Sequence, residues 1–287
     1  MGPSISNNTY IIEESEADLA RLIEMDTLYT RYAGGVFPER QGFLHSERRV
    51  LDLACGPGGW ALQVASGHPG LEVTGVDINQ RVIDYARSRA RGRGLSNAGF
   101  ERMDITGPLA FPSQTFDLVN ARFVHTVLLQ EDWLPFLREC QRVLRPGGIV
   151  RLTEAEVAVS NMPASNQLLS LLPRTFKQNG RSFSPDGSSM GITYMLGHFL
   201  RQAGFVETRE RAFTVNFSVG TDAQSGYTQH LRIVFSSHLL GAYLIKEGLM
   251  SANEYQTLYE NALEEMVSDE FCGISFLLTV VAEKPFS

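Results

Sequence analysis

Residues 50–60, Val-Leu-Asp-Leu-Ala-Cys-Gly-Pro-Gly-Gly-Trp, constrain the fold of this chain more than any other stretch. The apolar run from Val50 to Ala54 predicts a buried strand, and the pattern from Trp60 to Ser66 is helical. The glycines between them carry no Cβ, so the backbone can turn tightly and a ligand can approach it closely. Strand, glycine turn and helix together indicate the start of a nucleotide-binding βαβ unit.

A carboxylate at the end of the next predicted strand strengthens this interpretation. The apolar run 71–76 leads into Asp77, which lies 19 residues after Gly58. A carboxylate about 20 residues past such a loop can accept hydrogen bonds from the hydroxyls of a ribose. The loop lacks the Gly-x-Gly-x-x-Gly pattern, and no Gly-Lys-Ser/Thr follows it, which argues against NAD(P) and ATP.

The hydrophobic pattern predicts an α/β fold with a doubly wound parallel sheet, because short apolar runs alternate with helical segments. The first five predicted strands cover 49–54, 71–77, 99–103, 116–121 and 149–153. The predicted helices among them cover 58–67, 79–93 and 132–144, and an earlier helix runs from an N-cap at Ser15 to Tyr32. The later part predicts helices near 168–172 and over 191–203, a strand over 205–215, two helices within 222–269 and a last strand over 271–282.

Composition excludes several classes of function. The chain has 287 residues and a net charge of −7, so a nucleic-acid partner is not expected, since phosphate binding needs a basic face. Three cysteines without metal spacing favour free thiols in a reducing, cytoplasmic setting. No signal peptide is expected, and no apolar run is long enough to insert into a membrane.

Five motifs occur in order: VLDLACGPGG, VTGVDIN, MDIT, FDLVNARFV and LRPGGIVRLTE. Together they resemble the class I S-adenosylmethionine-dependent methyltransferases of the small-molecule, natural-product or UbiE-like type. The resemblance covers about residues 48–155. It implies a Rossmann-like, doubly wound, seven-stranded, mostly parallel sheet with an antiparallel last strand and a helical cap. Three parts are then expected: an N-terminal helix and lid (1–45), a cofactor-binding core (46–155), and cap insertions with closing strands (156–287).

The resemblance also implies a set of cofactor contacts. It assigns S-adenosyl-L-methionine as cofactor and S-adenosyl-L-homocysteine as its product. Asp52 would reach the ammonium group of the methionine moiety, although it could instead only order the loop. The remaining contacts are Gly56 and Gly58 at the cofactor backbone, Asp77 at the ribose, Ile78, Asp104 and Ile105 at the adenine, and Asn120 and Ala121 at the methionine end. Ala54 is also included among the expected cofactor contacts, although it stands where the wider family has glycine.

The N-terminal helix offers a further cofactor contact. Its aromatic residues Tyr29 and Tyr32, with Phe37, could pack in the core or form a lid over the cofactor site. We include Tyr32 among the expected cofactor contacts. The helix could cover its own site or that of a neighbouring subunit, so a homo-oligomer remains open.

Three residues are candidates for the catalytic groups, and we include His125 and Glu154 among the expected site residues. His125 follows the fourth strand, where the ligand crevice of such a sheet opens, and could act as a general base or only bond locally. Glu154 and Glu156 follow the fifth strand at the same edge, and either could orient a substrate or accept a proton. His230 and His238 share a helical face, yet no third ligand accompanies them, so no metal is expected.

The apolar residues of the predicted cap helices could line a substrate pocket or simply pack in the core. Such a pocket favours a small hydrophobic metabolite, of the kind found in secondary metabolism, methylated on oxygen or carbon. Two alternatives remain: a related enzyme that binds the cofactor but catalyses cyclisation or rearrangement, and a non-catalytic binding protein.

Overall fold

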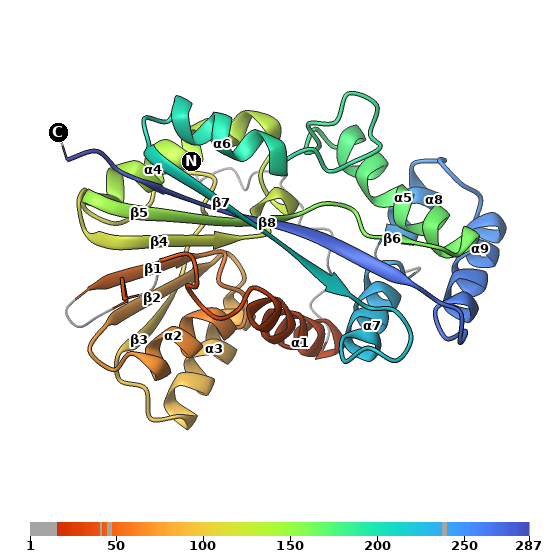
Figure 1. Ribbon diagram of the computed structural model, residues 1–287, viewed down its shortest axis with the longest axis horizontal. Helices are drawn as coiled ribbons and strands as arrows, with labels where there is room; N and C mark the ends of the chain where they lie inside the picture. Colours follow the sequence, from red (N-terminus) through yellow and green to blue (C-terminus); the bar gives the residue numbers. More distant parts are fainter. Residues whose placement is uncertain (1–15, 41, 45–47, 237–239, 287) are drawn as a thin grey trace, which may run out of the picture.

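A computed structural model describes residues 16–40, 42–44, 48–236 and 240–286. Its centre is one eight-stranded sheet with the order β3-β2-β1-β4-β5-β8-β6, and β7 pairs with β8 beside this path (Figure 1). The parallel strands are β1 (Arg49–Leu53), β2 (Glu72–Asp77), β3 (Ala98–Arg102), β4 (Phe116–Arg122) and β5 (Leu144–Ala155). The remaining strands are β6 (Val159–Ser160), β7 (Val206–Asn216) and β8 (Gly273–Glu283).

The expected Rossmann-like sheet with an antiparallel last strand is confirmed. Strand β8 runs antiparallel to β5 and to β7. The sheet has eight strands where seven were expected, because the two-residue β6 pairs with the far end of β8. A strand this short has little sequence signal, since alternation cannot be read from two residues.

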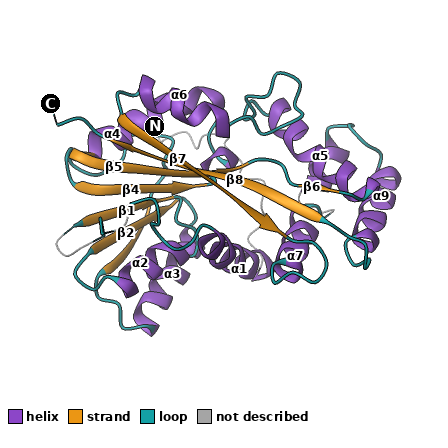
Figure 2. Cartoon of the chain, viewed as in Figure 1, coloured by secondary structure: helices purple, strands orange, loops and turns teal. Residues whose placement is uncertain are grey.

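Helices cover both faces of the sheet (Figures 1 and 2). Helices α2 (Gly59–Gly67) and α3 (Gln80–Gly92) lie on one side, and α4 (Trp133–Val143) and α6 (Thr193–Gln202) lie on the other. Burial on both faces explains why β1 reads as a continuous apolar run, and Val50, Leu51 and Leu53 are fully buried. Asn79 caps α3, with its side chain accepting from the backbone of Arg81.

The remaining helices form a cap beyond one end of the sheet, and we call this group the cap. It consists of α1 (Glu16–Tyr32), α5 (Pro163–Gln178), α7 (Gln224–Val234), α8 (Leu240–Lys246) and α9 (Ala252–Glu265). The prediction of two helices within 222–269 is wrong, since α7, α8 and α9 all lie there. Ser251 caps α9 in a reciprocal capping box with Glu254. Ser15, the expected N-cap of the first helix, lies outside the described residues, and so does His238.

A row of polar side chains crosses the interior of the sheet. Asp52, Asn120 and Arg151 are neighbours on β1, β4 and β5. The Asn120 amide donates to Asp52 at 2.7 Å, and Arg151 donates to the Asn120 oxygen at 2.9 Å. Arg151 also forms a bidentate pair with Glu39 at 3.0 and 3.1 Å. This row ties the segment after α1 to the centre of the sheet.

We predict that Arg151→Met lowers the free energy of unfolding by about 3–5 kcal/mol, because it leaves the buried Glu39 carboxylate without its partner. Urea denaturation measures the change. The double variant Arg151→Met/Glu39→Leu should regain much of the loss, since no unpaired charge then remains. A loss below about 1 kcal/mol in the single variant would contradict the assigned role of the pair.

Candidate active site

One continuous cavity of about 610 Å³ lies between the carboxyl ends of the parallel strands and the cap. One end is bordered by the glycine loop and by the residues that follow β2 and β3. The other end extends beneath α1, α5 and α7. Its lining at the first end includes Asp52, Ala54, Cys55, Gly56, Asp77, Ile78, Met103, Asp104 and Ile105. Ligand sites of open α/β sheets lie at this edge, so the cavity is the candidate active site.

The glycine loop turns through left-handed backbone conformations. Ala54 and Gly56 both have φ near +52°. A Cβ on Gly56 would meet nothing within 4 Å, so this side of the loop is open to a ligand. The expectation for Gly58 is wrong: a Cβ there would lie 2.7 Å from the Phe100 ring, so Gly58 is needed for packing and does not line the cavity.

The two acidic strand ends lie where the sequence predicts them. Asp77 accepts backbone N–H bonds from Gly56 and Asn79, each at 2.9 Å, and each oxygen keeps a further lone pair. Burial raises the pKa of Asp77. Asp104 accepts from the backbone and hydroxyl of Thr106 through one oxygen and is exposed at the cavity rim. Ile78, 46% exposed, offers an apolar surface between them.

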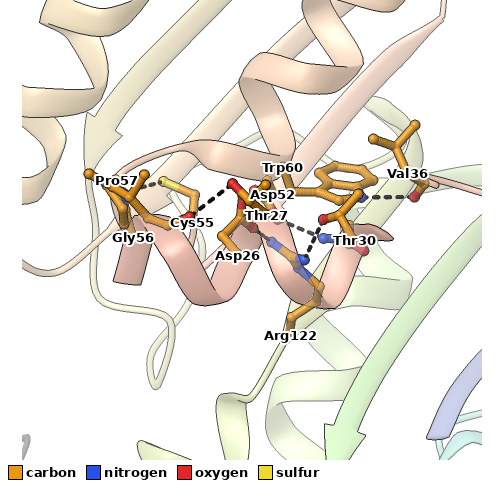
Figure 3. A network of polar contacts seen from close by, with 12 residues as sticks. Asp26, Thr27, Thr30, Val36, Asp52, Cys55, Gly56, Pro57, Trp60 and Arg122 are labelled. Atoms are coloured by element: carbon orange, nitrogen blue, oxygen red, sulfur yellow. Dashed lines mark hydrogen bonds and ion pairs between the residues drawn. The ribbon is translucent and has the colours of Figure 1, made fainter. Parts of the chain in front are cut away.

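The carboxylate of Asp26, on the cap helix α1, also faces the glycine loop (Figure 3). Asp26 on α1 pairs with Arg122 at the end of β4, and Arg122 also donates to the Thr30 hydroxyl at 3.2 Å. A Cβ on Gly59 would lie 1.8 Å from the Asp26 carboxylate, which therefore rests against the first turn of α2. Asp26 Oδ2 and Asp52 Oδ2 are both buried and have no hydrogen-bond partner among the described residues. This end of the cavity can therefore accept a positively charged donor.

Asp52 is the most perturbed group of this network. Burial raises its pKa to about 7, against the opposing effects of the Arg122 charge and the Asn120 hydrogen bond. A carboxyl group with this pKa is only partly ionised at neutral pH. A nearby cation would favour its ionised form and lower its pKa.

Three expected cofactor contacts are corrected by the structure. Asn120 and Ala121 are fully buried and do not line the cavity. Their place is taken by Arg122 and Phe123, because the strand continues further before it reaches the open edge. Tyr32 also lies outside the cavity, and its hydroxyl donates to Asp222.

His125 and Glu154, two separate candidates in the sequence, form a buried pair. His125 Nδ1 contacts Glu154 Oε2, and Glu154 Oε1 accepts from the backbone of Val124 at 3.0 Å. Glu154 is fully buried, and burial raises its pKa against the lowering effect of His125. His125 lines the cavity, so its other ring nitrogen is the one that can serve a ligand. Phe123, in a left-handed conformation with φ near +58°, makes the turn that places His125.

Glu156 has a different role from Glu154. It accepts from the backbone of Met190 at 2.8 Å and from the Thr193 hydroxyl at 2.6 Å. These bonds attach the segment before α6 to the end of β5. Glu156 is therefore occupied in holding the cavity wall.

Comparison with known proteins agrees with this geometry. Residues 50–148 match a family described as a methyltransferase domain. A demethylmenaquinone methyltransferase of Deinococcus radiodurans is 36% identical over 114 residues, which are 40% of this chain and 46% of that protein. Residues 50–148 of this chain therefore form a methyltransferase domain of the class I S-adenosylmethionine-dependent type. The match spans less than half of this relative's length.

Two solved structures share the methyltransferase fold over nearly all of this chain. Phosphoethanolamine N-methyltransferase 2 of Haemonchus contortus, solved in complex with S-adenosyl-L-methionine, has a TM-score of 0.52 at 18% identity, over 93% of this chain and 52% of that one. The 4+2 cyclase SpnF has a TM-score of 0.54 at 20% identity, over 95% and 98%. At these identities the likeness extends to the fold alone.

Several residues that line the cavity were missed by sequence reasoning. They are Asp18, Arg21, Asp26, Arg122 and Arg181. Asp26 had a usable signal, because it shares a helical face with the apolar Leu19 and Leu22 and therefore faces inward. Arg122 belongs to the FDLVNARFV motif, where the sequence pointed to Asn120 and Ala121 instead, and Asp18, Arg21 and Arg181 belong to segments without a recognisable motif. Among the described residues, no cluster of histidine, cysteine or acidic side chains could hold a metal ion, and no described helix is long and apolar enough to span a membrane.

We predict that stability depends on pH through Asp52. Its folded pKa of about 7 lies above the usual value of 3.8, so the folded state holds this proton more tightly. The resulting stabilisation is full below pH ~4 and is lost as the pH rises to ~7, by an amount on the order of 4 kcal/mol. Asp52→Asn, which keeps the shape and the bond from Asn120, should lack this component.

Urea denaturation of both proteins between pH 4 and 8 measures the difference. The free energy of unfolding of the wild-type protein should fall relative to that of Asp52→Asn across this range. A constant difference between the two proteins would show that Asp52 titrates normally.

Proposed function

We propose that this protein transfers a methyl group from S-adenosyl-L-methionine to oxygen or carbon of a small hydrophobic metabolite. One observation carries the proposal: a single cavity joins the glycine loop and the acidic strand ends to an apolar chamber that contains His125. The free thiols of the described Cys55, Cys140 and Cys272 support a reducing, cytoplasmic setting.

The residues at the first end of the cavity fit this cofactor. Asp77 has acceptor capacity for the ribose hydroxyls, and the open face of Gly56 leaves room for the cofactor backbone. The unpartnered oxygens of Asp52 and Asp26 suit an ammonium group, and Arg122 suits a carboxylate. Ile78 and Ile105 would contact the adenine ring.

The chemistry requires little from the protein beyond alignment and proton removal. When bound, S-adenosylmethionine supplies an activated methyl group. The cap excludes water and holds the acceptor in line, which lowers the entropic barrier. His125 would take the proton that the acceptor must lose, and Glu154 would orient the ring and stabilise the imidazolium that results.

We expect Asp77→Asn to weaken S-adenosylhomocysteine binding about 10- to 100-fold, because it removes a charged acceptor of two hydroxyl bonds. Isothermal titration calorimetry measures the dissociation constant. Asp84→Asn is the matched control, since Asp84 is an exposed carboxylate on α3 that pairs with Arg87. An unchanged dissociation constant in Asp77→Asn would refute the cofactor assignment.

We expect His125→Ala to lower kcat roughly 100-fold or more while cofactor affinity stays the same, as for loss of a general base. Glu154→Gln should cause a smaller loss, because the ring remains but its orientation and charge balance change. His198→Ala is the control, since His198 is exposed on α6 and does not line the cavity. Full turnover in His125→Ala would eliminate it as the base.

The acceptor can be found by incubating the protein with methyl-deuterated cofactor and a metabolite extract, followed by mass spectrometry. A labelled product together with S-adenosylhomocysteine is the expected result. Conversion of a metabolite without label would instead support the cyclisation or rearrangement alternative.

A further inference from the structure

A second polar group lines the cavity where α1 meets α7. Arg21 and Asp18 of α1 are each only 6% exposed, and Arg21 Nε donates to Asp18 at 2.7 Å. Arg21 Nη1 also contacts His230 Nδ1 of α7 at 3.1 Å. All three residues line the cavity, and none belongs to the glycine loop, the acidic strand ends or the His125–Glu154 pair.

The contact with Arg21 determines which ring nitrogen of His230 carries a proton. A guanidinium only donates hydrogen bonds, so Nδ1 must accept and the proton resides on Nε2. Burial and the Arg21 charge lower the pKa of His230 well below its usual value, which keeps the ring neutral. Among the described residues no hydrogen bond to Nε2 is formed, and the half-buried ring borders the cavity. His230 therefore presents one N–H donor of defined position.

Arg21 adds a second unsatisfied donor beside it. Its Nη2 is buried without a hydrogen-bond partner among the described residues. A buried donor left unpaired costs about 1–3 kcal/mol, and the bonds of Arg21 to Asp18 and His230 offset that cost, so Arg21 is held where it fixes the His230 ring.

The neighbouring wall is apolar, with Leu231, Val234 and Leu240 among its members. Asp18 already balances the charge of Arg21, and His230 is neutral. A substrate carboxylate placed beside this group would thus find no unbalanced cation within it, and its burial there would be costly. An uncharged oxygen acceptor in a hydrophobic framework avoids that cost.

We propose that His230, positioned by Arg21, binds a carbonyl oxygen of the substrate at the opposite pole from the atom that is methylated. This inference rests on the proposed function, since it takes the cavity as the acceptor site. It narrows the substrate class to hydrophobic molecules that carry a ketone or similar carbonyl in addition to the methylated group. His230 is then a binding residue for specificity, and Arg21 is a positioning residue.

The test uses two phenols on the same bicyclic frame, 6-hydroxy-1-tetralone and 6-hydroxytetralin, which differ only by the ketone. Their dissociation constants are measured by calorimetry with and without saturating S-adenosylhomocysteine. The wild-type protein should bind the ketone about tenfold more tightly, the effect of one good hydrogen bond. His230→Phe should abolish this preference, whereas His230→Gln, which keeps an N–H donor, should retain part of it.

Val234→Ala is the matched control on the same helix. The smaller side chain enlarges the cavity at its apolar wall. It should change the dissociation constants of both probes by the same factor, so their ratio stays the same. The proposal is overturned if wild-type protein binds the two probes equally or binds neither, or if the preference survives in His230→Phe. The affinity for S-adenosylhomocysteine, measured in the same samples, tests the proposed function separately. The two tests are independent because the ratio of the probes' dissociation constants is also measured without S-adenosylhomocysteine.

The role of Arg21 has its own spectroscopic readout. Imidazole ¹⁵N chemical shifts should report His230 as the Nε2–H tautomer in the wild-type protein. In Arg21→Met the ring should titrate nearer to the ordinary value for histidine and lose this single tautomer. Unchanged shifts would refute the positioning role.

Discussion

The buried polar row across the sheet is the constraint on which the site depends. Asp52, Asn120 and Arg151 lie side by side on three strands, and Glu39 completes the row from the segment after α1. Charges removed from water are tolerated only when each has a partner, so every member requires the next one. The row therefore joins the acid before the glycine loop to the segment after α1 and fixes that segment on the sheet.

The two ends of the cavity differ because different layers build them. Strand ends and the glycine loop form the first end, so it is rich in backbone donors and carboxylates. Cap helices form most of the second end, whose lining is largely apolar and includes the group around Arg21, while His125 reaches it from the end of β4. The left-handed turn at Phe123 lies between them. Such a backbone conformation persists only where the surrounding structure enforces it. Here it turns the chain at the end of β4 so that His125 lines the cavity.

Most of the core could be predicted, because its strands and helices obey simple periodicities. The errors have specific causes. Asn120 and Ala121 were expected in the cavity, but β4 extends past them to Arg122, and strand ends are the least certain part of any pattern. Tyr32 sits on a helix face that turns away from the cavity. Position 58 requires glycine because the Phe100 ring packs against it. The local sequence cannot distinguish this reason for a glycine from a need for ligand access.

The sequence by itself determined the order of strands and helices, the glycine loop and the acids Asp77 and Asp104, because local spacing encodes all of these. Only the tertiary structure decided which polar groups meet. The pairs Arg21–His230 and Asp26–Arg122 are separated by 209 and 96 residues, and His125 is 29 residues from Glu154. Each pair joins different elements: Arg21–His230 depends on how two cap helices pack together, Asp26–Arg122 on how the cap packs on the sheet, and His125–Glu154 on the pairing of β4 with β5. Such contacts leave no periodic pattern in the sequence. The cavity end at the glycine loop could therefore be predicted from the sequence, and the end beneath the cap could be described only from the fold.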